Sequence, residues 1–303
     1  MIATGGDGDG DATGRILALT HVGFLTDDIE RSSALWEQLF GAKPAERRPI
    51  WFASEEGVLA TFLPIGSSAI EPLQPLLEGT MQRRELLAGR RAFHLSFRVK
   101  NLAAVMGRLR AAGFWTQLRV PGRVVTVHRG WVDRASSFGM TLEFIDVDEV
   151  KAFRASGPMA EEKPPATPWL RSIESVGHCV RDIEVATRMY VDKLGFVPLA
   201  ATPVLVEEEG YLLRKLRLPA GPAIDLVQPV NDRTVFSSSL ADVVEGMAYV
   251  AIKVSDFSAL EKHLVAQEAW VMRAHAGRRL PDRLWVHDRS TDGLRLLLIP
   301  DEG

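Results

Sequence analysis

The feature that most restricts the fold of this chain is a segment that occurs four times. Its first copy, residues 19–25, alternates in the way a strand does, and Asp27 or Asp28 then stands where a helix cap is expected before the amphipathic run 31–40. The other copies lie at 93–102, 176–184 and 248–256. The first and third copies are 154 residues apart and the second and fourth are 155 apart, so the chain contains two pairs of modules.

Each module reads as one strand, a helix and three further strands. This order predicts an α+β fold of four βαβββ modules in two pairs, with curved mixed sheets and helices outside. The later strands of the first two modules are predicted at 50–53, 58–64, 68–73, 116–120, 123–131 and 139–147, and a connecting helix at 76–88.

Composition shifts along the chain predict the domain boundaries. Residues 1–14 are rich in Gly and Asp and are expected to be disordered, whereas 151–167 are rich in Pro, Ala, Glu and Lys, as linkers are. The paired βαβββ domains are therefore predicted at 15–150 and 168–303.

The overall composition is that of a soluble globular protein. The chain has 303 residues, of which 46% are apolar and 25% charged, and no run reaches the roughly 18 apolar residues of a membrane span. Net charge is −3 with both signs interspersed, which argues against nucleic acid as a partner. The single cysteine and the lack of a visible secretion signal favour the cytoplasm. The sequence leaves open whether the protein is a homodimer.

Polar residues recur at matching places in the first two modules. Glu71 follows His21 by 50 residues, and Glu143 follows His94 by 49. If the two half-sheets close face to face, these four side chains converge on one interior point. Burying two imidazoles and two carboxylates is costly unless a cation neutralises them. We therefore predict one divalent metal ion bound by the quartet, and Zn, Co, Ni, Mn and Fe all suit such N and O ligands.

Each of these residues also has an ordinary structural explanation. His21 could make a simple hydrogen bond at a strand end, and Glu71 could be a solvated edge residue. The recurrence of His and Glu in two copies at nearly equal spacing favours the metal site. Other polar residues that could line a pocket are more simply explained as solvated surface groups, and they are Glu55, Glu56, Arg98, Arg123 and His128.

The second pair of modules provides an internal control. The positions that match the quartet hold Ser175, Asp225, Tyr249 and Leu297. Three of these four cannot form a good divalent site, so the second domain is predicted to be metal-free. His178 does not replace them, because it aligns with Phe24 and should point to the other face of its strand.

The repeats and the quartet resemble the vicinal oxygen chelate superfamily, which comprises glyoxalases, bleomycin resistance proteins and extradiol dioxygenases. The resemblance covers 16–147 and 169–300. His21, Glu71, His94 and Glu143 fall where bacterial glyoxalase I and methylmalonyl-CoA epimerase carry metal ligands. There are two departures. Four-module relatives usually keep their metal in the second pair, and Ala60 stands where some methylmalonyl-CoA epimerases have a separate glutamate base.

Ligand count indicates the reaction class. Iron oxygenases typically use two histidines and one carboxylate, whereas four protein ligands leave two adjacent octahedral positions, which suit two neighbouring oxygens of one substrate. This favours redox-neutral Lewis-acid chemistry through a chelated enediolate. The resemblance to glyoxalase I implies that Glu143 or Glu71 moves the proton.

The predicted function is thus a metal-dependent epimerase or isomerase. Its substrate would be a small 2-hydroxy-carbonyl compound, such as a sugar- or cyclitol-like ketone, a 2-oxo compound or an acyl thioester. A glyoxalase-type lyase, a ring-cleaving dioxygenase and a non-catalytic resistance protein that sequesters its ligand are the alternatives.

Overall fold

The computed structural model describes residues 14–44, 50–53, 56–121, 127–149, 167–231, 234, 245–274 and 282–302. Residues 1–13 of the predicted disordered segment and 151–166 of the predicted linker lie outside the described residues. The same holds for two of the polar candidates, Glu55 and Arg123.

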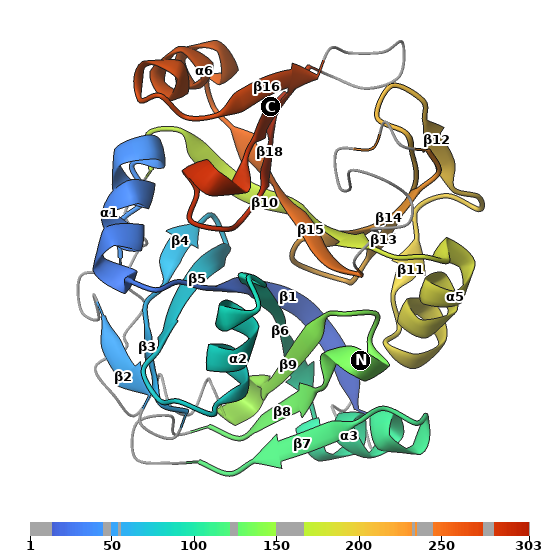
Figure 1. Cartoon of the computed structure of the whole chain (residues 1–303). Coiled ribbons are helices and arrows are strands. Elements are labelled where there is room, and N and C mark those ends of the chain that lie inside the picture. The colour runs from blue at the N-terminus through green and yellow to red at the C-terminus, as the bar shows by residue number, and fades with distance from the viewer. Residues whose placement is uncertain are drawn as a thin grey trace, which may run out of the picture.

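The N-terminal half, residues 14–149, forms one curled nine-stranded mixed sheet (Figure 1). Its strand order is β2-β3-β5-β1-β6-β9-β8-β7, with β4 paired to β5. Its strands are β1 (Arg15–Leu25), β2 (Trp51–Ala53), β3 (Val58–Ala60), β4 (Leu63–Ile65), β5 (Ser68–Pro75), β6 (Ala92–Lys100), β7 (Thr116–Arg119), β8 (Arg129–Val132) and β9 (Thr141–Asp146). Its helices are α1 (Ile29–Phe40), α2 (Met81–Leu87), α3 (Leu102–Ala111) and a 3-10 turn, Arg134–Ser136.

The C-terminal half, residues 167–302, repeats this arrangement in a second nine-stranded sheet. Its order is β11-β13-β14-β10-β15-β18-β17-β16, with β12 paired to β13. Its strands are β10 (Leu170–Cys179), β11 (Val197–Pro198), β12 (Val204–Val206), β13 (Tyr211–Arg217), β14 (Ala223–Pro229), β15 (Gly246–Val254), β16 (Val271–Ala274), β17 (Arg283–Val286) and β18 (Leu296–Pro300). Its helices are α5 (Ile183–Arg188), continued by a π-helical turn at Met189–Lys193, α6 (Phe257–Ala266) and a 3-10 turn, Asp288–Ser290. The predicted α+β fold with curled mixed sheets is confirmed.

The two modules of each half join edge to edge. In the N-terminal half, β1 pairs antiparallel with β6 and parallel with β5, so one continuous sheet crosses the module boundary. Convergence of the quartet was expected if two half-sheets closed face to face, whereas the structure joins them edge to edge in one curled sheet. The physical reason is that β1 and β6 each satisfy the other's backbone groups, which would be unpaired edges if the half-sheets only faced one another.

Local sequence signals set most helix ends. Asp28 caps α1 by accepting a hydrogen bond from the Arg31 amide at 3.0 Å, and Gly41 ends the helix with φ 67°. The helix predicted at 76–88 is shorter, because Thr80 caps α2 and the helix begins at Met81. The strand predicted at 58–64 is divided into β3 and β4, since these pair with different parts of β5.

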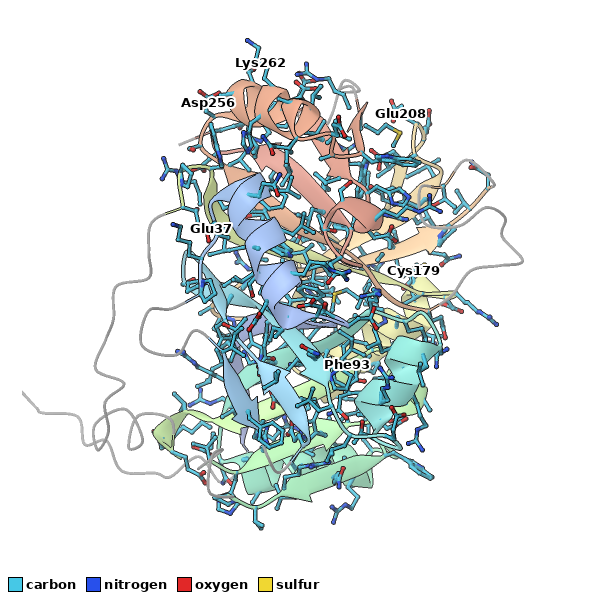
Figure 2. The ribbon with its side chains drawn as sticks, turned by 60° about the vertical axis from the view of Figure 1, so that its left-hand side comes forward. Glu37, Phe93, Cys179, Glu208, Asp256 and Lys262 are labelled. Carbon is cyan, nitrogen blue, oxygen red and sulfur yellow. The ribbon has the colours of Figure 1, made fainter. Side chains whose placement is uncertain are left out.

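The two halves pack against each other through a shared apolar core. Phe97 of β6 contacts Phe196 of the other half edge-on, with ring centroids 6.1 Å apart. Figure 2 shows α1, which carries Glu37, reaching α6, which carries Lys262, and Gln38 donates a hydrogen bond to Gln267 at 2.7 Å. Among the described residues, no helix has the length and apolarity needed to cross a bilayer.

Candidate metal centre

Strand register brings the four predicted ligands to one face of the N-terminal sheet. The backbone of Gly23 on β1 lies beside both Glu71 on β5 and His94 on β6. Ser96 of β6 in turn lies beside both His21 and Glu143. Because side chains alternate along a strand, all four predicted ligands project from the same side of the sheet, which we call the inner face.

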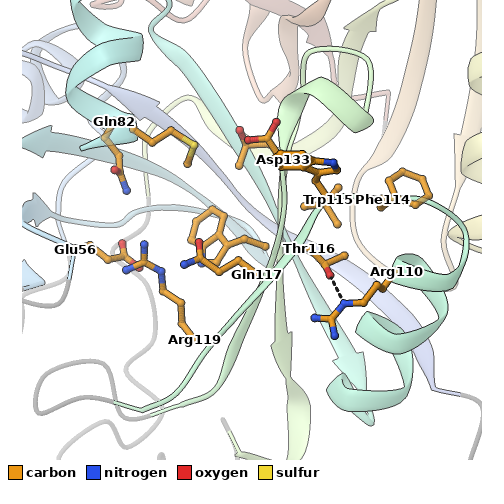
Figure 3. Close-up of a pocket in the computed structure, with 13 residues that line it drawn as sticks. Glu56, Gln82, Arg110, Phe114, Trp115, Thr116, Gln117, Arg119 and Asp133 are labelled. Atoms are coloured by element: carbon orange, nitrogen blue, oxygen red, sulfur yellow. Dashed lines mark hydrogen bonds between the residues drawn. The ribbon is translucent and has the colours of Figure 1, made fainter. Parts of the chain in front are cut away.

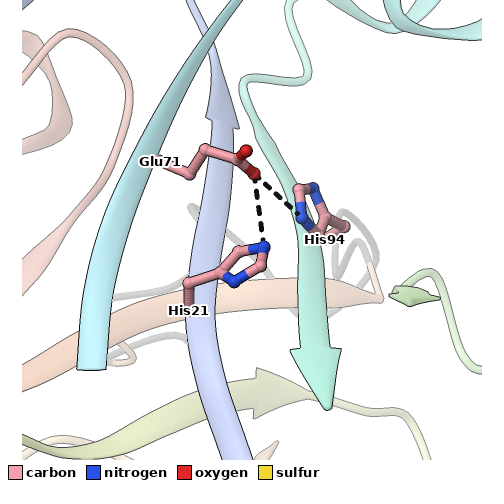
Figure 4. Close-up of side chains that lie close together, drawn as sticks. All are labelled: His21, Glu71 and His94. Carbon is pink, nitrogen blue, oxygen red and sulfur yellow. Dashed lines mark ion pairs between the residues drawn. The ribbon is translucent and has the colours of Figure 1, made fainter. Parts of the chain in front are cut away.

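The functional atoms of the quartet converge. Glu71 Oε2 lies 3.4 Å from His21 Nε2 and 3.3 Å from His94 Nε2 (Figure 4). Glu143 Oε2 lies 3.4 Å and 3.8 Å from the same two nitrogens. All four residues are buried, with 2% to 8% of their surface exposed. The ligand atoms of His21, Glu71 and His94 lie within 4.8 Å of one another, as ligands of one ion must.

The donor set fits a divalent cation. Two ligands bonded to one ion at 2.0–2.2 Å are themselves about 3 to 3.5 Å apart, close to these separations. Within the described residues, neither ring nitrogen of buried His94 makes a hydrogen bond. Leaving a buried polar atom unsatisfied costs about 1–3 kcal/mol, and an ion bound at Nε2 would remove this cost for that nitrogen. The cluster can therefore hold a metal ion.

Two residues next to the quartet position its imidazoles: Gly23 leaves space for the ring of His94, and Thr20 sets the tautomer of His21. A Cβ on Gly23 would lie 2.1 Å from the ring of His94, so only glycine leaves space for that ring. The Thr20 hydroxyl donates to the carbonyl of Ser96 at 3.1 Å and lies 3.3 Å from His21 Nδ1. With its proton so used, the hydroxyl oxygen accepts from Nδ1–H, which leaves Nε2 of His21 as the electron-pair donor facing the site.

Charges within the quartet shift its pKa values. Burial by itself lowers the pKa of His21, but the Glu71 charge and hydrogen bonding to Glu143 raise it to about 9. Burial raises the pKa of Glu71, yet the neighbouring His21 brings it down to about 2. The pKa of Glu143 is likewise lowered, against the effect of burial, by His21, His94 and Arg129. Without a metal ion, a proton on His21 is the local counter-charge.

A buried ion pair that the sequence reasoning missed stands beside the quartet. Arg129 on β8 contacts Glu56 at 2.5 Å and Glu143 Oε1 at 3.5 Å. The side chain of Glu56 is only 7% exposed, so its interpretation as a solvated turn residue was wrong. The same pair recurs in the C-terminal half as Glu209 and Arg283, 2.7 Å apart, and alignment of the repeats at these positions would have revealed it.

A cavity of about 340 Å³ is lined by two residues that neighbour the quartet, Trp131 and Glu56, but by none of the four quartet residues themselves. Trp131 forms part of its wall and packs edge-on against His94, with ring centroids 5.3 Å apart. Gln82 from α2 and Gln117 from β7 add amide groups to the lining (Figure 3). The indole N–H of Trp131 is buried and has no hydrogen-bond partner among the described residues. The cavity thus offers a small ligand several polar contacts next to the centre.

Comparison with known proteins assigns part of the chain to a family. Residues 20–126, which include His21, Glu71 and His94, match the Glyoxalase/Bleomycin resistance protein/Dioxygenase superfamily. The chain contains a domain of this superfamily. The comparison with curated proteins gave no match.

Two of the similar solved structures share the fold over nearly the whole chain, and a third aligns with less than half of it. A mutant of 4-hydroxymandelate synthase from Streptomyces coelicolor aligns with 95% of this chain and 94% of its own, at 12% identity and a TM-score of 0.69. BphC, a halotolerant catechol dioxygenase, aligns with 95% of this chain and 87% of its own, at 11% identity and a TM-score of 0.57. A methylmalonyl-CoA epimerase from Mycobacterium tuberculosis aligns with 46% of this chain and 93% of its own, at 23% identity and a TM-score of 0.41.

The remaining polar candidates lie away from the quartet or interact with other residues. His128 pairs with Glu149 at 2.8 Å, and Arg98 is half-buried further along β6. His178 lies in the C-terminal half on the face opposite Asp225, as its alignment predicted, where its Nε2 donates to the carbonyl of Phe138 at 2.7 Å.

Three of the four C-terminal residues that match the quartet are joined by hydrogen bonds. The hydroxyls of Ser175 and Tyr249 both donate to Asp225 Oδ2, at 2.6 Å and 3.0 Å. Lys215 adds an ion pair to the other oxygen at 3.7 Å. Leu297 belongs to an apolar cluster beside them.

Proposed function

We propose that this protein is a metal-dependent epimerase or isomerase that moves a proton next to a carbonyl group of a small substrate. The observation that supports it most directly is the convergence of His21, Glu71, His94 and Glu143 on one buried point beside a cavity. These four residues are the proposed metal ligands. Zn, Co, Ni, Mn and Fe are all compatible with them.

The bound ion would supply Lewis acidity, which polarises a carbonyl and acidifies the neighbouring C–H bond. The chain itself supplies the other parts. His21 and His94 face the centre through Nε2, and Glu71 and Glu143 are the carboxylates of the quartet, one of which would accept the substrate proton. Burial of all four excludes bulk water, so a carbanion-like state is not quenched at random.

The cavity supports a small, hydroxylated substrate. Its volume of about 340 Å³ is near the lower end of the range for ligand pockets. The amides of Gln82 and Gln117, which line the cavity, can bind hydroxyl groups. A sugar- or cyclitol-like ketone fits these contacts, and the acyl end of a thioester is the other substrate class we propose.

Proton exchange tests this proposal. Metal-loaded protein incubated in D2O with a panel of 2-hydroxy ketones, 2-oxo acids and acyl thioesters should place deuterium beside the carbonyl of at least one, without O2 uptake. Protein treated with a chelator is the control and should show no exchange. Stoichiometric O2 uptake, or tight binding without exchange or turnover, would refute the isomerase assignment.

A ring-cleaving dioxygenase is the second candidate, and one observation favours it. The most compact group is His21, Glu71 and His94, two histidines and one carboxylate, which is the ligand set typical of non-haem iron oxygenases. The two candidates differ in whether Glu143 is a ligand. Iron-dependent O2 consumption with a catechol would favour this alternative.

A further inference from the structure

The two carboxylates of the centre are held differently. Glu143 uses both of its oxygens, because Oε2 faces His21 and His94 while Oε1 lies 3.5 Å from the Arg129 guanidinium. Glu71 contacts only the two imidazoles, through Oε2, among the hydrogen bonds and ion pairs of the described residues. Both carboxylates would lose their contacts with the imidazoles on rotating away from the centre, but only Glu143 would also lose an ion pair with an arginine.

We propose that Arg129, anchored by Glu56, fixes Glu143 as the permanent carboxylate ligand and leaves Glu71 as the carboxylate that leaves the metal to accept the substrate proton. Arg129 is then a positioning residue. The part concerning Glu71 rests on the proposed isomerase function, whereas the part concerning Arg129 requires only that the quartet binds metal.

Arg129 is itself well fixed. Its guanidinium lies between Glu56 and Glu143, and both Arg129 and Glu143 are buried. A buried cation between two carboxylates has a strong electrostatic preference for that place, since leaving it would strand two charges in a low dielectric. Arginine also presents several donors in a rigid plane, so one guanidinium can face two carboxylates at once.

The C-terminal half separates this role from a structural one. Arg283 pairs with Glu209 at 2.7 Å on the equivalent strand, and both side chains are buried. The position that matches Glu143 is Leu297, which has no carboxylate to hold. The Glu–Arg pair is therefore common to both halves, while the contact from arginine to a predicted ligand occurs only in the first. Arg283→Gln is thus a matched control for Arg129→Gln.

Titration of the metal-free full-length protein with Co²⁺ tests the positioning role. Arg129→Gln should weaken Co²⁺ binding by about 10- to 100-fold, as loss of groups that orient metal ligands typically does. Arg283→Gln should bind Co²⁺ as the wild type does, although both variants lose a buried ion pair. Wild-type affinity in Arg129→Gln, or an equal loss in Arg283→Gln, would overturn the proposal.

A further variant guards against misfolding of Arg129→Gln. Glu56→Gln keeps the guanidinium and loosens its anchor, so its Co²⁺ affinity should fall between wild type and Arg129→Gln. Far-UV circular dichroism and thermal unfolding of the metal-free proteins identify any variant that does not fold. If Arg129→Gln does not fold, unchanged affinity in folded Glu56→Gln overturns the proposal.

Comparison of the two carboxylates tests the rest. Glu143→Gln should weaken Co²⁺ binding more than Glu71→Gln does, because only Glu143 is a fixed ligand. At saturating Co²⁺, Glu71→Gln should lose deuterium exchange by about 10²-fold or more, whereas Glu143→Gln should retain more of it. The reverse order in either measurement would overturn the assignment. If the wild type exchanges no substrate, the proposed function fails, and the order of Co²⁺ affinities still decides whether Glu143 is the fixed ligand.

Discussion

The two halves of this protein have equivalent strands in the same order but differ in how their inner faces satisfy charge. At the positions that match the quartet, the C-terminal half has one carboxylate, Asp225, which receives hydrogen bonds from two hydroxyls and an ion pair from Lys215. In the N-terminal half, two carboxylates face two imidazoles, and both ring nitrogens of His94 lack hydrogen bonds among the described residues. The fold therefore does not require the quartet. A metal ion bound by the quartet is the explanation that we propose.

The halves also share a device that is independent of the chemistry. Gly23 leaves space for the ring of His94, and Gly177 does the same for Tyr249, where a Cβ would lie 2.2 Å from the ring. The module thus places an aromatic or imidazole ring at this point in both halves. The two halves differ in whether this ring carries a nitrogen that could bind metal, as in His94, or a hydroxyl, as in Tyr249.

Loss of a ligand is the change with the largest expected effect. Purified protein should hold about one divalent ion per chain, and His94→Ala should reduce metal affinity by more than the roughly 100-fold typical of outer-shell changes. Glu143→Ala should also lose most of its metal. Elemental analysis measures this, and two ions in the wild type or full metal in both variants would contradict a single site.

Acid should destabilise the protein through His178, which is buried and uncharged. Burial lowers the pKa of His178 to about 4 from 6.5. The unfolded chain then binds a proton that the folded one does not, so the stability that is complete above pH 6.5 falls by up to roughly 3 kcal/mol as the pH drops to 4. Urea unfolding of metal-free wild type and His178→Gln at several pH values measures this. An equally steep pH dependence in the variant would disprove the role of His178.

His21 should show the opposite pH dependence, although it lies on the equivalent strand. With its pKa raised to about 9, its charged form stabilises the metal-free protein fully below pH 6.5, and this contribution is lost as the pH rises through 9. A metal ion must displace that proton, so affinity should increase about tenfold per pH unit well below pH 9, and about 50-fold between pH 7 and 9. Co²⁺ titrations across this range measure the slope, and a flat profile would contradict the assignment.

Removal of one hydroxyl from the C-terminal half should affect stability alone. Tyr249→Phe leaves Asp225 with one hydroxyl donor fewer and should lower the free energy of unfolding by about 1–2 kcal/mol. Metal content should not change. Retained binding of a candidate ligand by Glu143→Ala would instead indicate a second ligand pocket in this half.

The smallest expected effect concerns the tautomer of His21. Thr20→Val removes the hydroxyl beside Nδ1 and should weaken Co²⁺ binding by about 10-fold, the lower end of the range for such contacts. Thr20→Ser keeps the hydroxyl and serves as control. Equal affinities in the two variants would show that Thr20 does not set the tautomer.

Sequence reasoning reached the features that are local or that repeat. The strand–helix order, the cap at Asp28 and the inward position of the quartet all follow from alternation and spacing. That the quartet binds metal, and where the domains divide, remain predictions. Long-range pairing was harder to foresee. The edge-to-edge union of β1 and β6 and the burial of Glu56 both depend on partners more than 70 residues away, which no local pattern specifies.

The pairing of β1 with β6 makes metal binding depend on both modules of the N-terminal half. Each module supplies one imidazole and one carboxylate, so neither module alone presents more than half of the quartet. A bound ion would bridge the two modules. A one-residue shift in the pairing register of β1 and β6 would turn both His94 and Glu143 to the opposite face of the sheet. Occupancy of the centre would then depend on the correct register of two modules, and free metal would add to their mutual stability in proportion to the logarithm of its concentration.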